Sequence, residues 1–343
     1  MKLTRVGVDL AKQVFQVHGV DRQEQPVWSR RLRRDQWLKV LEQTVEPGCE
    51  IGMEACGGAH HWARALQGKG YLVKLLAPQF VKPYVKSNKN DANDAAAICE
   101  AMSRPCMRYV ALKTVEQQDI QAIHRVRAGL ITERTAKANQ VRGLVSEYGI
   151  VAPKQMTSLR RAVPQWLEDA QNGLSACFRA VLMGLYEDLQ SLDARVAEMD
   201  EQIEIIARDN EAACRLQQLR GIGPITATAL VAAVGDARQF KNGRQLSAAL
   251  GLTPKQHSSG SKEQHLGISK RGDKYLRSLL IHGARSVIYA AKGKTDRLSA
   301  WVTALAERSH ANIAAAALAN KTARIAWAML KHGTNYEPDR MTA

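Results

Sequence analysis

Four carboxylates near the start of the chain have the types and spacing for metal-dependent chemistry. Asp9 lies at the end of the alternating apolar segment RVGVDL, and Glu54 ends EIGME, just before a glycine-bearing helix start. Asp91 and Asp94 lie three residues apart at the head of the alanine-rich run DANDAAAICEAM. Residues three apart in a helix share a face, and active sites of mixed sheets gather at strand ends. The pattern therefore predicts that two strands and one helix bring acidic groups together.

Four carboxylates that meet in a small volume repel one another unless cations lie between them. If the strands that end near Asp9 and Glu54 are neighbours and the helix of Asp91 crosses their ends, repulsion among the carboxylates is costly without bound metal. Oxygen ligands suit Mg²⁺ or Mn²⁺, and two ions ~4 Å apart can stabilise both the attacking and the leaving oxygen of a phosphodiester. The alternative is helix capping, because aspartates at a helix start satisfy free N–H groups and suit the helix dipole.

The charge balance of the chain indicates a polyanionic partner. Its 343 residues, 45% of them apolar, carry a formal net charge of +16. Neutralising phosphates releases counterions whatever the base sequence, so nucleic acid is the predicted partner. No uncharged apolar run approaches the ~20 residues of a membrane span, and MKLTRVGVDLAK indicates a strand, so we expect a cytoplasmic protein with no membrane partner. The six cysteines form no C-x-x-C pair, which predicts reduced thiols and no zinc site.

The hydrophobic periodicity predicts an α/β region followed by all-α regions. Short alternating segments and helical segments in residues 1–112 are typical of a mixed sheet covered by helices. In residues 113–210 an apolar stripe predicts a coiled-coil helix, which we expect to pair with an earlier basic helix around residues 120–144. The alternative is one helix packed in a globular bundle. The stripe consists of Leu182, Leu185, Leu189, Leu192, Val196, Met199, Ile203 and Ile206.

Residues 211–335 indicate a small, mainly α domain, followed by a polar tail at residues 336–343. The turn LRGIGP before a Thr/Ala helix is typical of a helix-hairpin-helix-like element, in which Gly221 and Gly223 let backbone N–H groups approach a phosphate. The alternative is a plain turn between two core helices. Further on, residues 251–280 combine a polar Ser/Gly loop with a basic stretch suited to phosphate contacts. Its cations are Lys255, Lys262, Lys270, Arg271, Lys274 and Arg277.

The order of the acidic motifs resembles that of a known family. GVDLAK, MEACG and KNDANDA follow one another as D-x-A-K, M-E-A and N-D-x-x-D do in the DEDD transposases of insertion-sequence family one-ten. MEACGGAHHWAR and NKTARIAWAML are similar to the subgroup typified by insertion sequence eleven-eleven. The resemblance implies a RuvC-like, RNase H-type N-terminal nuclease domain in which Asp9, Glu54, Asp91 and Asp94 bind metal.

The same resemblance extends to the serine-rich segment, where the GLTP…SG…G-x-S-K-x-G…LR pattern is present in full. In the family the serine of the SG pair is the nucleophile that becomes joined to DNA, and it corresponds to Ser259. Ser258 and Ser261 flank it here, so the assignment depends on the following Gly260. The resemblance implies a bacterial, nucleoid-associated recombinase that rejoins strands through a phosphoserine bond. A non-coding bridge RNA would pair with donor and target DNA.

Recombining two duplexes needs about four strand cuts, so we expect a homotetramer built as a dimer of dimers. Two alternatives remain open on the residues. One is a RuvC-like, structure-specific endonuclease that uses metal-activated water and leaves Ser259 as part of a loop. The other is a non-catalytic nucleic-acid scaffold whose carboxylates are caps and surface charges.

Overall fold

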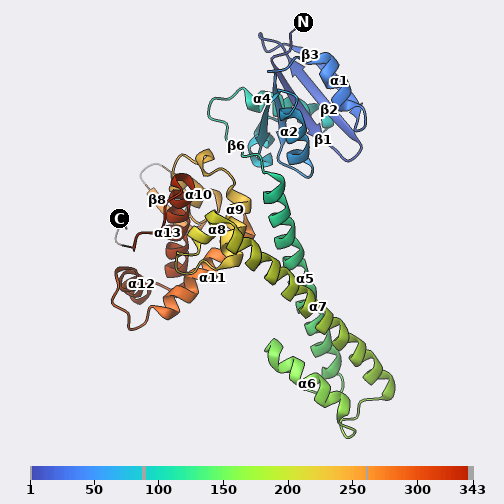
Figure 1. Ribbon diagram of the computed structural model, residues 1–343, viewed down its shortest axis with the longest axis vertical. Helices are drawn as coiled ribbons and strands as arrows, with labels where there is room; N and C mark the ends of the chain where they lie inside the picture. Colours follow the sequence, from blue (N-terminus) through green and yellow to red (C-terminus); the bar gives the residue numbers. More distant parts are fainter. Residues whose placement is uncertain (1, 87–89, 260–261, 339–343) are drawn as a thin grey trace. The chain divides into compact units, whose positions relative to one another are not determined.

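A computed structural model describes residues 2–86, 90–259 and 262–338. The chain divides into two compact units, residues 1–114 and 115–343, which are described separately (Figure 1). Within the described ranges, no helix is both long enough and apolar enough to cross a membrane.

Unit 1 is built on a six-stranded mixed sheet, and short apolar segments of the sequence predicted five of its strands. The strand order is β3-β2-β1-β4-β5-β6. Neighbours β1 and β4 are parallel, as are β4 and β5, whereas β2, β3 and β6 run antiparallel to their partners. The strands are β1 (Arg5–Leu10), β2 (Val14–Val20), β3 (Pro26–Arg33), β4 (Glu50–Glu54), β5 (Leu72–Leu76) and β6 (Tyr109–Val110).

Helices cover both faces of this sheet. Buried residues of α1 (Trp37–Thr44) and α2 (Ala59–Gln67) share one apolar cluster with Val6 and Val8 of β1. Alternate residues of a strand point to opposite faces, so Gly7 faces the other side, where α4 (Asp91–Met102) packs. Between β5 and α4 lie α3 (Pro78–Val81) and a 3₁₀ turn at Lys82–Tyr84.

Unit 2 begins with a long helical pair. Helix α5 (Val115–Ser146) runs beside α7 (Ala176–Asp209), and α6 (Met156–Glu168) packs against α7 (Figure 1). The predicted pairing of the apolar stripe with the earlier basic helix is therefore confirmed, and it occurs within one chain. Leu182 and Leu189 are fully buried in a cluster with residues of α5 and α6.

Three basic residues of α5 are directed at α7. The guanidinium of Arg127 pairs with Asp200, and Arg134 pairs with Asp193 at 3.1 Å. Lys137 pairs with Asp188 at 2.9 Å. An acidic row thus runs beside the apolar stripe of α7 and occupies three cations of the basic helix.

The rest of unit 2 packs around one apolar core. Its helices are α8 (Glu211–Leu216), α9 (Pro224–Val234), a 3₁₀ turn (Ala237–Gln239), α10 (Gly243–Ala249), α11 (Lys274–Ala290), α12 (Arg297–Arg308) and α13 (Ala311–His332).

The serine-rich segment differs from the predicted loop. It forms an antiparallel hairpin of β7 (Pro254–Ser259) and β8 (Lys262–Ile268). Every residue of β7 is exposed. A strand that buries neither face needs no alternation of apolar and polar residues, and the sequence pattern therefore gave no strand signal.

Candidate active site

Asp9 and Glu54 lie side by side at the ends of neighbouring parallel strands. The register of β1 and β4 pairs Val8 with Met53, and the two carboxylate residues come next on each strand. Both are partly buried. Residues at equal levels on parallel strands point to the same face. The predicted adjacency of these two strand ends is thus present in the structure.

The face on which the two carboxylates lie is the one that α4 covers. Val8 and Met53 belong to the core on the α1 and α2 side. Asp9 alternates with Val8 along β1, and Glu54 alternates with Met53 along β4, so both leave the sheet on the opposite side.

Two glycines set the distance of α4 from the sheet. A Cβ atom at Gly7 would lie 2.2 Å from the Ala95 carbonyl oxygen, and one at Gly52 would lie 2.1 Å from Met102 Sδ. At Gly7 the contact is with helix backbone, so only glycine fits there, whereas at Gly52 it is with the flexible Met102 side chain. The helix therefore rests directly on the backbone of β1 and β4.

The start of α4 is directed toward Asp9. Gly7 of β1 lies against Ala95 of α4. The next residue of β1 on the same face, toward the C-terminal end of the strand, is Asp9. Two strand residues span ~6.6 Å, and four helix residues span ~6 Å. Asp91 lies four residues before Ala95 in α4. Asp9 and Asp91 therefore lie at similar distances along their elements from the contact between Gly7 and Ala95.

The cap of α4 is Asn90, which differs from the aspartate cap considered above. Its side-chain oxygen accepts a hydrogen bond from the Asn93 amide at 2.8 Å. Asp91 is the first helical residue and is exposed, and Asp94 is partly buried. Both still lie in the first turn, where negative charge suits the helix dipole. Asn90, and not Asp91 or Asp94, therefore caps the start of α4.

The thiol of Cys56 reports on the electrostatics of the strand ends. Burial raises its pKa, and the Glu54 and Asp9 carboxylates raise it further. Both carboxylates are therefore close enough to act on one side chain. Cys56 therefore experiences the negative charge of both strand ends.

The donor set consists of carboxylate oxygens, which fit a hard cation such as Mg²⁺ or Mn²⁺. Among the residues that the structure describes, no three His, Cys, Asp or Glu side chains are close enough to hold a metal ion. The structure thus brings Asp9, Glu54 and the start of α4 to one edge of the sheet, without closing them into a complete set of ligands.

Ser259 belongs to unit 2, whereas the four acidic residues belong to unit 1. It is the last residue of β7, is exposed, and pairs with Lys262 across the hairpin. Gly260, on which its assignment depends, lies outside the described residues together with Ser261. A hydroxyl at the end of an exposed hairpin is accessible to a large substrate such as DNA.

The basic residues near the hairpin divide into two groups. Lys255, Lys270, Arg271 and Lys274 are exposed, as phosphate contacts require. Arg277 is buried, with only 9% of its surface exposed.

The guanidinium of Arg277 serves the fold. Its Nη1 donates to the Leu250 carbonyl oxygen at 3.0 Å and to the Arg271 carbonyl oxygen at 3.2 Å. These bonds tie α11 to the segments beside it, in contrast to the predicted phosphate contact. The side chain of Lys262 lies outside the described part of the chain.

The two glycines of LRGIGP also have different surroundings. Gly221 has φ +83°, and a Cβ atom there would lie 2.7 Å from the Gly283 carbonyl oxygen of α11. Close packing of the turn on α11 therefore requires this glycine. Gly223 precedes α9, and a Cβ atom there would meet nothing within 4 Å. Of the two, Gly223 has the open space that an approaching phosphate needs.

A group of cations that the sequence patterns do not indicate surrounds a pocket of unit 2, namely Arg244, Arg297, Lys321 and Arg324. They come from three helices, so no local pattern joins them. The one available signal was the motif NKTARIAWAML, whose Lys321 and Arg324 share a helix face.

Comparisons with known proteins connect these sites to one class. A family model described as a transposase, of the DEDD type of IS110, matches residues 6–150. A second, described as the transposase IS116/IS110/IS902 family, matches residues 213–299. The first match contains all four carboxylates, and the second contains Ser259 and the exposed basic residues. Together they define a transposase of an insertion sequence.

Similar proteins match over almost the whole chain. A probable family 20 transposase of Pseudomonas aeruginosa is 51% identical over 98% of this chain and 100% of its own length. The transposase for insertion sequence element IS1111A of Coxiella burnetii is 47% identical over 96% of this chain and 90% of its own length. The transposase for insertion sequence element IS1328 of Yersinia enterocolitica is 39% identical over 97% of this chain and 98% of its own length. The chain belongs to the IS110/IS116/IS902 family of transposases, as the motif order predicted.

Proposed function

We propose that this transposase cuts and rejoins DNA strands by dividing the chemistry between its two units. In unit 1, Asp9, Glu54, Asp91 and Asp94 hold one or two Mg²⁺ or Mn²⁺ ions. In unit 2, Ser259 attacks the DNA phosphate. The observation that carries the proposal is the arrangement of Asp9 and Glu54 on adjacent parallel strand ends, beneath the start of the helix that bears the other two carboxylates.

The topology of unit 1 supports an RNase H-type, RuvC-like nuclease domain. Three antiparallel strands, β3-β2-β1, continue into the parallel strands β4 and β5, and α4 crosses the sheet on the acidic side. When bound, divalent ions neutralise charge that develops on phosphodiester oxygens. The carboxylates hold them, and the direct contact of α4 with β1 keeps the ligands of both elements at fixed separation.

The serine step conserves the number of phosphodiester bonds. A bond forms between Ser259 Oγ and phosphorus, the bond from phosphorus to one deoxyribose oxygen breaks, and the proton of the serine leaves with that oxygen. Attack by a deoxyribose hydroxyl of the new partner strand reverses these steps and frees the serine. The covalent bond stores the energy of the broken one, so rejoining needs no nucleotide cofactor. Exposed cations beside the hairpin suit the binding of the DNA backbone.

The choice of DNA site is assigned to a guide RNA that pairs with donor and target DNA. The net charge of +16 supports simultaneous binding of several nucleic-acid strands. Four strand cuts with one serine each require four copies of the chain, arranged as a dimer of dimers. Light scattering of the complex with RNA and DNA should therefore give the mass of a tetramer, and a monomeric complex would contradict this part of the proposal.

A second candidate is a nuclease in which water attacks. The four carboxylates that define the DEDD type are sufficient for metal-dependent hydrolysis, and this favours the candidate. The two functions differ in one product, because only the serine pathway leaves protein joined to DNA.

Ser259→Ala separates the two candidates, and Ser258→Ala is the matched control on the same strand. Each protein is incubated in Mg²⁺ with its native flanking transcript and end-labelled DNA that spans the junction of the element. Denaturing gels then show adducts, and mass spectrometry locates the modified serine. We expect Ser259→Ala to form no adduct and no joined product, whereas Ser258→Ala retains both. Undiminished cleavage without adduct in Ser259→Ala would favour the nuclease.

A further inference from the structure

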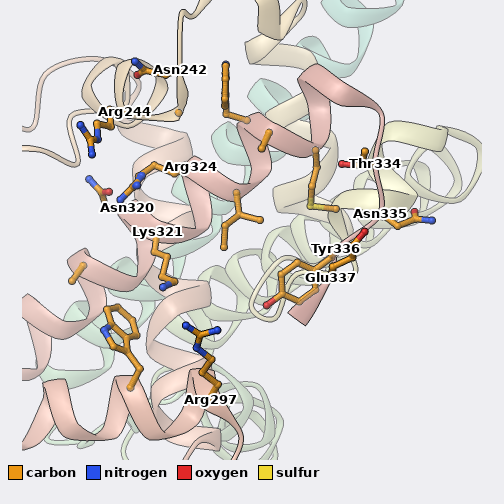
Figure 2. Close-up of a pocket in the computed structure, with 17 residues that line it drawn as sticks. Asn242, Arg244, Arg297, Asn320, Lys321, Arg324, Thr334, Asn335, Tyr336 and Glu337 are labelled. Atoms are coloured by element: carbon orange, nitrogen blue, oxygen red, sulfur yellow. The ribbon is translucent and has the colours of Figure 1, made fainter. Parts of the chain in front are cut away.

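A pocket of about 830 Å³ lies in unit 2, and its lining residues include neither Ser259 nor any other residue of the hairpin. Figure 2 shows its walls, which come from α10, α12, α13 and the segment that follows α13. Much of the motif NKTARIAWAML lines it, and α13 lies beyond the residues that either family model matches. The functions proposed above leave this motif without a role.

The polar part of the pocket is strongly cationic. Arg244, Arg297, Lys321 and Arg324 line it, and Glu337 is the single acidic residue among the lining residues. Burial lowers the pKa of Lys321, and Arg297 and Arg324 lower it further. Lys321 is therefore partly desolvated and is repelled by both of these arginines. A bound anion with several oxygens would relieve that repulsion, and phosphate matches the fork of donors on arginine.

The other part of the pocket is aromatic and apolar. Lys321 Nζ lies 4.9 Å from the centre of the Trp301 ring, so the cationic and aromatic parts adjoin. The Trp327 indole is held in place because Nε1 donates to the Ala237 and Phe240 carbonyl oxygens at 3.1 and 3.2 Å. Tyr336 adds a third aromatic side chain. Rings beside cations are the means by which proteins hold bases and phosphates of single strands.

We propose that this pocket binds an unpaired nucleotide of a single-stranded nucleic acid. Arg297, Lys321 and Arg324 contact its phosphate, and the aromatic wall takes its base. The volume falls within the ~300–1,000 Å³ typical of small-ligand sites, and a base still stacked in a duplex cannot enter such a hollow. This pocket binds nucleic acid without catalysing a reaction, so the proposal goes beyond the cleavage and joining of strands proposed above. DNA and RNA share the recognised groups, and the experiment distinguishes them.

Binding is tested on the full chain in EDTA, where no cleavage takes place. Fluorescein-labelled dT₁₂, U₁₂ and a 12-base-pair duplex serve as probes for fluorescence anisotropy over a range of salt concentrations. The variants are Lys321→Gln and Arg324→Gln. The matched control is Lys292→Gln, which removes the same charge from an exposed position just after α11, outside the pocket lining. The ratio of dT₁₂ to U₁₂ affinity reports which sugar the pocket prefers.

Each pocket variant should weaken single-strand binding about tenfold and lower the salt slope by about 0.7, the loss of one phosphate contact. Duplex binding and the control should change less than about twofold. Equal losses for duplex and single strands, or an equal loss in Lys292→Gln, would overturn the proposal, because they would reflect net charge alone.

Photocrosslinking of the unaltered protein provides an independent check that does not depend on the variants being folded. Twelve-base strands that carry one 5-iodouracil are irradiated with the protein and the adducts are mapped by mass spectrometry. We expect adducts on Trp301 or Tyr336, which line the pocket. Adducts confined to residues outside the pocket would overturn the proposal.

Discussion

Gly7 of β1 and Ala95 of α4 are in direct contact, so close that a Cβ atom at Gly7 would lie 2.2 Å from the Ala95 carbonyl oxygen and 2.6 Å from the Cys99 amide nitrogen. This contact fixes the level at which α4 crosses the sheet. Asp9 lies two residues beyond Gly7, and Asp91 lies four residues before Ala95. The spacing of the proposed metal ligands thus depends on a residue that has no side chain.

Gly7→Ala should lower the free energy of unfolding of unit 1 by about 1–3 kcal/mol, because the added methyl group meets backbone atoms that cannot turn away. The control is Gly57→Ala in the same unit, where a Cβ atom meets nothing within 4 Å. Urea denaturation followed by tryptophan fluorescence measures both. Equal stability of the two variants would show that α4 can move off the sheet without loss.

Asp9→Asn and Glu54→Gln should each reduce the rate of DNA cleavage in Mg²⁺ by about 10³-fold, since loss of a metal ligand removes several kcal/mol of charge stabilisation. Glu50→Gln is the control. Glu50 begins β4, at the opposite end from Glu54, and pairs with Lys74. A partly exposed ion pair of this kind contributes ~1 kcal/mol or less. Cleavage by Asp9→Asn at the normal rate would exclude the metal site.

Asp193 of α7 holds together two arginines, Arg134 of α5 and Arg160 of α6. Its side chain is only 25% exposed. Asp193→Asn should lower the free energy of unfolding of unit 2 by about 1–3 kcal/mol, because two partly buried cations lose their common partner. The control Asp188→Asn alters a pair whose carboxylate is 59% exposed. Guanidinium denaturation followed by circular dichroism should show a loss in the control below about 1 kcal/mol.

His124 makes the stability of unit 2 depend on pH. Its Nε2 lies 2.9 Å from Thr228 Oγ1 and its Nδ1 lies 3.0 Å from the Tyr275 hydroxyl. Thr228 Oγ1 donates to the Pro224 carbonyl oxygen, so it accepts from Nε2–H, and Nδ1 accepts from Tyr275. The neutral ring satisfies this network. Burial, with a smaller effect from Arg127, lowers the pKa of His124 to about 4.

The unfolded chain therefore binds the proton that the folded chain excludes. Stability should be full above the unfolded pKa of ~6.5 and should fall as pH decreases toward 4, by on the order of 3 kcal/mol. His124→Gln should remove most of that pH dependence, while His282→Gln, at an exposed position of α11, should leave it unchanged. Thermal unfolding at several pH values measures this. A wild-type midpoint that did not change between pH 7 and pH 4.5 would contradict the assignment.

Local patterns predicted a large part of this structure. The five strands from Arg5 to Leu76 follow from alternation, because each has at least one face in the core. The pairing of α7 with the basic helix follows from spacings of three and four, which place Leu182 and Leu189 on one buried stripe. The hairpin escaped prediction because every residue of β7 is exposed, so no alternation of apolar and polar residues marks it. Ser259 was predicted as the nucleophile only through its resemblance to a family motif.

By itself, the sequence determined the family of the protein and five strands of the first sheet, and it predicted four acidic positions as metal ligands, since these depend on residue types and short spacings. Only the tertiary structure decided what several of those residues face. It placed Asp9 and Glu54 on neighbouring strand ends under α4, turned Arg127 and Arg134 toward α7, and buried Arg277 against carbonyl oxygens. It also gathered Lys321, Arg324 and Arg297 around one pocket. The local sequence around a charged residue is the same whether its side chain faces solvent or another part of the chain. Its role therefore depends on which distant segments fold against it.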